Sequence, residues 1–276
     1  MVKRLLTIQD VSCVGQCSAT VALPVISACG VECAVLPSAV LSNHTGGFKS
    51  WSFHDLTPEM PKIESEWKRN GLTFDAFYTG YVCANQIDPI LSICASAARP
   101  GALRFVDPAM ADNGRLYAGF ADDFPREMAR LVQGADYVLP NLTEAALLLG
   151  ETPVLEGYDE AFVERTVRNL MSLGARTVVL TGVSFRPEEL GVAVYDGREV
   201  RYDFNPRLRR QSHGTGDVFA SVFAGAVMRG FAPLDAAALA ADVVCDAISA
   251  TAEDHWYGVS FESVLGGLAR RFAPAS

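Results

Sequence analysis

The chain has 276 residues, of which 50% are hydrophobic and 20% charged, so it can bury one large core and is not expected to be disordered. Its 23 Lys and Arg residues against 32 Asp and Glu give a formal net charge of −9. A negative surface repels nucleic acid and anionic lipid, and no apolar run is long enough for a membrane helix, so we expect neither partner.

The first apolar run ends at Gln9 and Asp10, too early for a signal peptide. The chain has seven cysteines, an odd number that cannot all pair in disulfides, and this fits reduced thiols. We therefore expect a cytoplasmic protein.

Short apolar segments alternate with amphipathic ones along the first two thirds of the chain. We expect strands at residues 4–8, 32–36, 76–79, 103–106, 137–139 and 177–180. We expect helices at residues 15–29, 59–70, 86–99, 124–133, 142–149 and 162–173. Short strands separated by helices are typical of a parallel sheet that is covered on both faces.

The pattern changes near residue 190. Residues 191–195 and 199–204 flank Asp196-Gly197, a dipeptide typical of tight hairpins, and the following residues are expected to be helical to the end. No linker or repeat divides the chain. The sequence therefore predicts a single domain over residues 1–276, a three-layer α/β/α sandwich around a mostly parallel sheet.

The most informative segment is Gly214-Thr215-Gly216-Asp217, which precedes a helix marked by the spacing of Phe219 and Phe223. A glycine-rich turn at a helix N-terminus offers free N–H groups to an anion such as phosphate. Asp217 does not fit a site that only binds anions. It fits a base that takes the proton of a substrate hydroxyl beside the transferring phosphoryl group, although a plain helix cap is the alternative.

Other polar residues directly follow predicted strands: Asp107, Asn141 with Glu144, and Thr181 with Gly182. Ligands of open parallel sheets bind at the carboxyl ends of the strands, so these residues are expected to converge with Gly214–Asp217. Carboxylates at this edge suit Mg²⁺. Each residue taken alone is equally consistent with a cap or a turn.

These segments resemble, in chain order, motifs of the ribokinase-like superfamily. Gly214–Asp217 is similar to its anion-hole and base motif, and Asn141–Glu144 to its Asn-x-x-Glu motif. Asp107–Tyr117 resembles the Asp-Pro-Val-Met-Gly-Asp…Tyr segment of the vitamin kinases. Ser42-Asn43-His44-Thr45-Gly46 closely resembles a segment of the pyridoxal and pyridoxamine (vitamin B6) kinases.

The resemblance implies ATP-dependent phosphorylation of the 5′-hydroxyl of pyridoxal, pyridoxamine or pyridoxine. It implies that Asp217 is the base and that Gly214, Thr215 and Gly216 stabilise the moving phosphoryl group. The other implied roles are ATP binding by Asp107, Asp112, Tyr117, Asn141, Thr181 and Gly182, Mg²⁺ binding by Glu144 and Asp107, and ring binding by Thr45 and Tyr81. Relatives are commonly homodimers, and a monovalent cation such as K⁺ is left open.

The chain departs from the B6 kinase pattern after Ile8-Gln9, where Ser-His is usual and Asp10-Val11-Ser12 stands instead. Asp10 or Ser12 would then hold polar groups of the ring, and a carboxylate at Asp10 would favour a cationic amine such as that of pyridoxamine. The alternative is that Asp10 caps a turn and faces solvent. His213 has no counterpart in these motifs, and the Arg207–Arg210 cluster is either an exposed loop or part of the ATP end.

Two other functions remain open at this point. A hydroxymethylpyrimidine kinase of thiamin synthesis would share the fold, but that branch usually has Cys where Asp217 stands. A non-catalytic regulator that binds a vitamin or a nucleotide would not need a base such as Asp217. The sequence contains no Gly-x-x-x-x-Gly-Lys-Ser/Thr motif, which excludes a P-loop kinase.

Overall fold

The computed structural model describes residues 2–210 and 212–273, so Met1 and residues 274–276, the ends of the predicted domain, lie outside the described residues. The strands are β1 (Arg4–Ser12), β2 (Glu32–Leu41), β3 (Phe53–Asp55), β4 (Phe74–Thr79), β5 (Ala98–Val106), β6 (Ala111–Asp112), β7 (Arg115–Leu116), β8 (Tyr137–Val138), β9 (Thr177–Val183), β10 (Glu189–Tyr195) and β11 (Val200–Pro206).

Within the described ranges, nine of these strands form one sheet in the order β11-β10-β9-β8-β5-β4-β1-β2-β3, and β6 pairs with β7. The six strands from β9 to β2 in this order run parallel. Antiparallel β3 extends one edge and the β10–β11 hairpin extends the other. The hairpin predicted at Asp196-Gly197 is confirmed, and the carboxyl ends of the parallel strands meet at one edge of the sheet.

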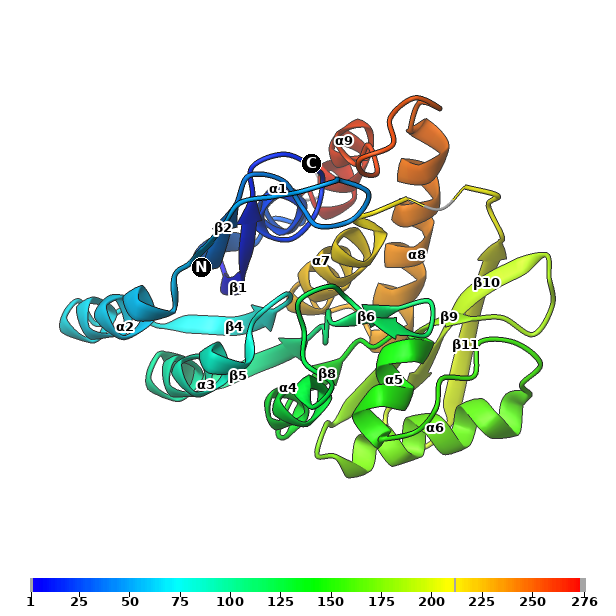
Figure 1. The fold of residues 1–276 in the computed structure, drawn as a ribbon, viewed down its shortest axis with the longest axis horizontal. Helices are drawn as coiled ribbons and strands as arrows, with labels where there is room; N and C mark the ends of the chain where they lie inside the picture. Colours follow the sequence, from blue (N-terminus) through cyan, green and yellow to red (C-terminus); the bar gives the residue numbers. More distant parts are fainter. Residues whose placement is uncertain (1, 211, 274–276) are drawn as a thin grey trace.

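Helices cover both faces of the sheet, as predicted (Figure 1). One face carries α1 (Ala19–Ala28), α7 (Thr215–Met228), α8 (Pro233–Ala250) and α9 (Glu262–Phe272). The other carries α2 (Met60–Arg69), α3 (Ile87–Ser96), α4 (Phe124–Val132), α5 (Leu142–Leu149) and α6 (Glu160–Ser172), with 3₁₀ turns η1 (Thr57–Glu59) and η2 (Ala84–Gln86). No helix in the described part of the chain is long and apolar enough to cross a membrane.

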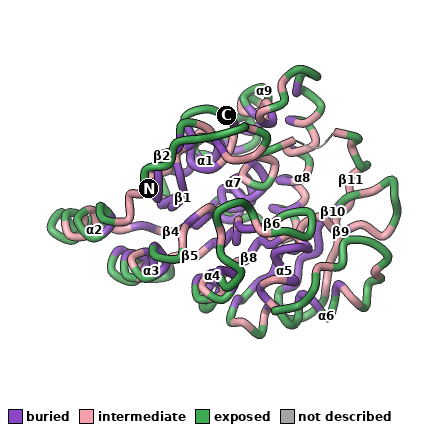
Figure 2. The backbone as a smooth tube through the Cα atoms, in the orientation of Figure 1, coloured by how far each residue is buried: buried purple, intermediate pink, exposed green. Residues whose placement is uncertain are grey.

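The sheet separates two hydrophobic cores, and strand alternation supplies both of them. Leu5 of β1 packs on the side of α7, whereas Leu6 and Ile8 pack on the side of α3. Figure 2 shows the buried residues gathered in the sheet and on the helix faces turned towards it. The three-layer α/β/α fold predicted from the sequence is therefore confirmed.

Helix α7, which follows the glycine-rich turn, is buried along most of its length. Every residue from Val218 to Met228 is buried. The ring of Phe223 lies edge-on to Phe105 and Tyr137 of the sheet, at centroid distances of 6.2 and 5.4 Å. Burying one such side chain contributes about 1.5–3 kcal/mol. The first turn of α7 is thus anchored by a rigid, fully packed helix.

Three predicted boundaries are wrong. The helix expected over residues 15–29 begins only at Ala19, because Gly15 and Ser18 have φ angles of 97° and 54°. Residues 98–99, expected to be helical, begin β5. A loop at residues 251–261 separates α8 from α9, so the chain after the hairpin is not continuously helical.

Candidate active site

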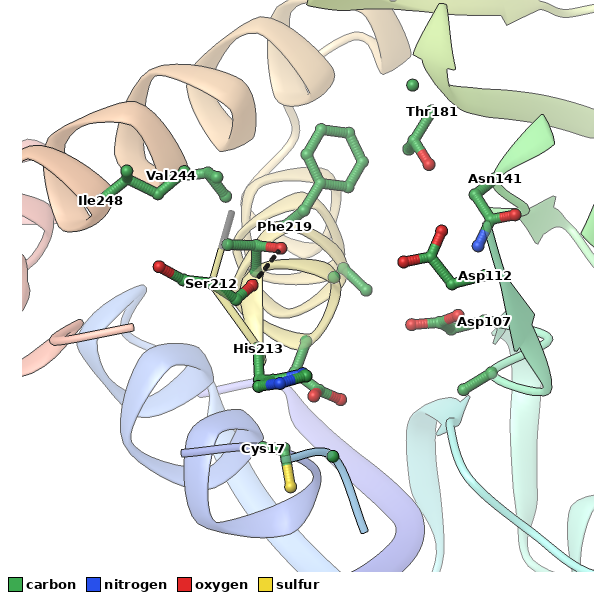
Figure 3. Close-up of a pocket in the computed structure, with 18 of the residues that line it drawn as sticks. Cys17, Asp107, Asp112, Asn141, Thr181, Ser212, His213, Phe219, Val244 and Ile248 are labelled. Carbon is green, nitrogen blue, oxygen red and sulfur yellow. Dashed lines mark hydrogen bonds between the residues drawn. The ribbon is translucent and has the colours of Figure 1, made fainter. Parts of the chain in front are cut away.

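A cleft of about 870 Å³ lies at the carboxyl ends of the parallel strands. All of the candidate residues predicted from the sequence line it: Asp10, Ser12, Thr45, Tyr81, Asp107, Asp112, Tyr117, Asn141, Glu144, Thr181, Gly182, Gly214, Thr215, Gly216 and Asp217. Figure 3 shows Asp107, Asp112, Asn141 and Thr181 on one side of this space and Ser212 and His213 on the other. The roles of these residues stay predictions, whereas their convergence is observed.

The N-terminus of α7 forms the turn at the middle of the cleft. Gly214 caps the helix with φ 81°, and a Cβ atom there would lie 1.8 Å from the carbonyl oxygen of Gln16, so only glycine fits. The first intrahelical bond runs from the N–H of Val218 to the carbonyl of Gly214 at 3.1 Å. The N–H groups of Thr215, Gly216 and Asp217 precede it, which suits an anion.

Asp217 lies half-buried in the first turn of α7. Burial raises the pKa of Asp217 to about 7, the charge of Asp10 adds to this shift, and a hydrogen bond from the backbone of Ser18 opposes it. A carboxyl group with this pKa can exchange a proton near neutral pH.

Asp10 and Ser12 form one buried unit at the end of β1. The Ser12 hydroxyl donates to Oδ2 of Asp10 at 2.8 Å, and the Ser18 hydroxyl lies near the same carboxylate. Burial raises the pKa of Asp10 above its usual value, although these hydroxyl groups lower it. The side chain is only 3% exposed, so the alternative in which Asp10 faces solvent is wrong. The pairing of β1 with β2 shifts register between Gln9 and Val11, where Asp10 lies.

Asn141 and Glu144 form a capping box at the start of α5. Oε2 of Glu144 accepts from the N–H of Asn141 at 2.9 Å, and Oε1 accepts from Met110 and Ala111 at 3.1 and 3.4 Å. The amide of Asn141 donates to the carbonyl of Ala111 at 2.8 Å. These two residues therefore fasten the segment after β5 onto α5. Thr181 joins the same edge through its N–H, which donates to Pro140.

Asp107, Glu144 and Asp217 form an acidic cluster in the lining of the cleft. Burial raises the pKa of Asp107 well above its usual value, and the charges of Glu144 and Asp217 raise it further. Burial also raises the pKa of Glu144 to about 8, against three backbone N–H groups that lower it. A cation relieves repulsion of this kind, and the carboxylate oxygens of Asp107 and Glu144 are the kind of ligand that suits Mg²⁺.

The described residues hold no group of three or more His, Cys, Asp and Glu side chains placed to bind a metal by themselves. Mg²⁺ in phosphoryl-transfer sites typically keeps waters and binds the phosphates of the substrate through only one or two carboxylates.

The loop after β2 forms the end of the cleft near Asp10. Nδ1 of His44 accepts from the N–H of Gly46 at 2.9 Å, so Nε2 must carry the proton that is shared with the carbonyl of Tyr257 at 2.7 Å. Burial lowers the pKa of His44, which favours this neutral form. The ring of His213 packs at 5.2 Å from that of His44. Thr45 lies between His44 and Gly46 in this loop.

The opposite end of the cleft is apolar. Phe219, Val244 and Ile248 face it from α7 and α8 (Figure 3). The arginine cluster beside it is divided: Arg207 and Arg209 are exposed at the rim, whereas Arg210 donates to the carbonyls of Thr251 and His255 at 2.8 and 2.6 Å. The cluster is thus both an exposed loop and part of the cleft lining.

Residues 21–258 match the phosphomethylpyrimidine kinase family. The chain belongs to this family. Its fold closely matches a crystal structure, containing pyridoxal, of a proposed phosphomethylpyrimidine kinase from Bacteroides thetaiotaomicron, at 36% identity and a TM-score of 0.91 over 97% of this chain and 96% of that one. It also matches pyridoxal kinase from Lactobacillus plantarum, at 32% identity and a TM-score of 0.90 over 98% of both chains.

This member of the phosphomethylpyrimidine kinase family has a further relative in Arabidopsis thaliana, the thiamine biosynthetic bifunctional enzyme TH1. The two sequences are 30% identical over 255 residues. The match covers 86% of this chain and 47% of the relative, so the chain spans about half the length of that enzyme. The resemblance to ribokinase-like vitamin kinases is confirmed, and the protein is a kinase of the group that contains pyridoxal and hydroxymethylpyrimidine kinases.

Sequence reasoning on this kinase missed Ser18 and Cys17, which line the cleft between β1 and α1. Ser18 is 5% exposed and contacts both Asp10 and Asp217. A serine directly before an apolar helical run is a usual signal for a helix start, and it would have shortened the helix expected from residue 15. Burial raises the pKa of Cys17, which keeps its thiol protonated.

Proposed function

We propose that this kinase transfers the γ-phosphoryl group of ATP to the 5′-hydroxyl of a vitamin B6 compound, as a single cytoplasmic domain. The observation that carries the proposal is the carboxyl group of Asp217, whose pKa is raised to about 7 beside the glycine turn of α7. A base is useful at this position only if a hydroxyl loses its proton next to a bound phosphoryl group.

In the proposed reaction, Asp217 takes the proton of the hydroxyl while its oxygen attacks the γ-phosphorus, and the bond to the ADP oxygen breaks. The N–H groups of Thr215 and Gly216 point at the negative charge of the moving group and stabilise it. The backbone of Ser18 lies beside the carboxylate of Asp217 and favours its charged form. A Mg²⁺ ion at Asp107 and Glu144 would neutralise charge on the phosphates.

The nucleotide is proposed to extend from this point towards the apolar end of the cleft. Phe219, Val244 and Ile248 offer a surface for a base, and the exposed Arg207 and Arg209 offer positive charge at the rim. Asp112, Tyr117, Thr181 and Gly182 lie around the phosphates in this proposal. We further propose a homodimer, and we leave the use of K⁺ open.

Hydroxymethylpyrimidine is the second candidate substrate, favoured by the family match and by the thiamine-related relative. The carboxylate at Asp217 and the Ser42–Gly46 segment favour a B6 compound instead. A non-catalytic regulator is disfavoured, because the chain belongs to a kinase family and retains a base.

The test is a panel of acceptors with ATP and Mg²⁺: pyridoxal, pyridoxine, pyridoxamine and hydroxymethylpyrimidine, with the phosphate ester as the measured product. We expect at least one B6 compound to be the best acceptor. Asp217→Ala should retain ATP binding but reduce turnover by at least about 10²-fold, the lower range for a lost base.

Turnover of Asp217→Ala within a few-fold of the unmodified protein would remove Asp217 from the mechanism. Phosphorylation of hydroxymethylpyrimidine alone would replace the proposed substrate with the second candidate.

A further inference from the structure

The carboxylates of Asp10 and Asp217 both lie near Ser18, at the end of the cleft where the substrate hydroxyl is proposed to bind. The hydroxyl group of Ser18 lies close enough to Asp10 to lower its pKa, and the backbone of Ser18 lies close enough to Asp217 to do the same. Both carboxylates line the same space. They therefore lie close enough for one small ring to reach both through neighbouring substituents.

Asp10 retains capacity to accept another hydrogen bond. A carboxylate has two oxygens with about four acceptor positions. The hydroxyl of Ser12 occupies one of them at 2.8 Å, and the hydroxyl of Ser18 and a backbone N–H lie near the same carboxylate, so all of the nearby donors are uncharged. A carboxylate that is 3% exposed gains most from a donor that a ligand brings into this space.

The protein supplies no cation for Asp10 in the described lining of the cleft. The arginines that line it belong to the Arg207–Arg210 segment, and the described lining contains no lysine. His44 lies nearby, but both of its ring nitrogens are engaged with backbone groups in the neutral form. The missing donor is therefore expected from the substrate.

We propose that Asp10 selects substrates that carry an N–H donor on the ring atom next to the one that bears the hydroxymethyl group. This inference rests on the proposed function, since Asp217 fixes the reacting hydroxyl. Pyridoxamine places a protonated aminomethyl group at that position, pyridoxine places a hydroxyl there, and pyridoxal places an aldehyde that has no proton to donate. A ring amino group beside the hydroxymethyl group, as in hydroxymethylpyrimidine, satisfies the same rule.

The test compares kcat/KM for pyridoxamine, pyridoxine and pyridoxal. The unmodified protein should prefer them in that order. Asp10→Ser should lower the ratio of pyridoxamine to pyridoxal by about 5- to 30-fold, the range for a partly desolvated charged hydrogen bond. Asp10→Asn, which keeps the size but loses the charge, should lower it in the same direction, and Ser12→Ala should change it much less.

Binding titrations of the three vitamers without ATP separate this inference from the proposed function. If no vitamer is phosphorylated but the binding of pyridoxamine still depends on Asp10, the selection holds and the proposed reaction fails. If vitamers are phosphorylated and the ratio does not change in Asp10→Ser and Asp10→Asn, the selection fails and the reaction stands. A preference of the unmodified protein for pyridoxal would overturn the inference even if both variants failed to fold.

Discussion

Three carboxyl groups in the cleft of this kinase hold their protons more tightly than exposed acids do. The pKa of Asp217 is raised to about 7 and that of Glu144 to about 8, in both cases chiefly by burial. Asp107 is shifted upward as well, and its neighbours contribute to the shift. The charged form of this cluster thus costs free energy in the folded chain that it does not cost in the unfolded one.

The stability of the ligand-free protein should therefore fall as the pH rises. Below the ordinary values of 3.8 for Asp217 and 4.5 for Glu144, each group is neutral in both states and has no effect. Between those values and about 7 to 8, the folded state binds more protons than the unfolded state, so the free energy of unfolding decreases with pH. Calorimetric melting should give a lower Tm at pH 8.5 than at pH 6.5.

Added Mg²⁺ should raise Tm more at pH 8.5, where the carboxylates are ionised, than at pH 6.5. Asp217→Asn provides the control, since it removes one of the charges and should reduce the dependence on pH. An equal effect of Mg²⁺ at both pH values would show that the ion does not bind at this cluster.

Among the elements, the connection from β1 to α1 tolerates little change at Gly15. Gly15 has φ 97°, and a Cβ atom on it would lie 1.9 Å from Cδ2 of His44. The imidazole cannot move away without losing its hydrogen bonds to Gly46 and Tyr257. The loop around Thr45 and the start of α1 are therefore fitted to each other.

Gly15→Ala should lower the free energy of unfolding by more than the roughly 1–3 kcal/mol expected for a strained backbone alone. It should also raise KM for the alcohol, because the displaced His44 carries Thr45 with it. Gly71→Ala is the matched control: φ there is 62°, but nothing lies within 4 Å of the added Cβ atom. Urea unfolding of both variants measures the difference, and equal costs would mean that the contact with His44 is easily relieved.

Helix starts could be predicted from the sequence where the residues that determine them are close together in the chain. The capping box of Asn141 and Glu144 and the glycine turn before Asp217 lie in continuous segments, so both helix starts could be predicted. The start of α1 was missed although its signal is local too: Ser18 directly precedes an apolar run, where serine usually marks a helix start.

At the scale of the molecule, hydrogen bonds join three connections: the loop after β2, residues 207–210 after β11, and the loop from α8 to α9. Arg210 joins the last two through the carbonyls of Thr251 and His255, while Tyr257 joins the last loop to His44. The sheet and its layers could be predicted from hydrophobic periodicity, but these links could not, because they involve backbone atoms remote in sequence.

Arg210→Ala should release the loop from α8 to α9. The loss of hydrogen bonds from a charged donor predicts a decrease in unfolding free energy of about 1.5–3 kcal/mol. KM for the alcohol should rise while kcat changes little, because Tyr257 loses its position beside His44 and Asp217 does not move. Arg209→Ala removes an exposed neighbour that is proposed to face the nucleotide, so it should leave the unfolding free energy and KM for the alcohol unchanged.

Steady-state kinetics and urea unfolding of the two arginine variants check this expectation. Identical behaviour of Arg210→Ala and Arg209→Ala would mean that the loop keeps its place without the guanidinium group.

The backbone of Ser18, with φ 54° and ψ −137°, has a consequence for how this kinase can adapt. A non-glycine residue in such a conformation costs about 1–3 kcal/mol, and glycine would relieve most of it. Glycine would also remove the hydroxyl that lies near Asp10 and loosen the backbone that lies near Asp217. Selection for heat resistance alone would therefore favour a residue at this position that selection for turnover rejects.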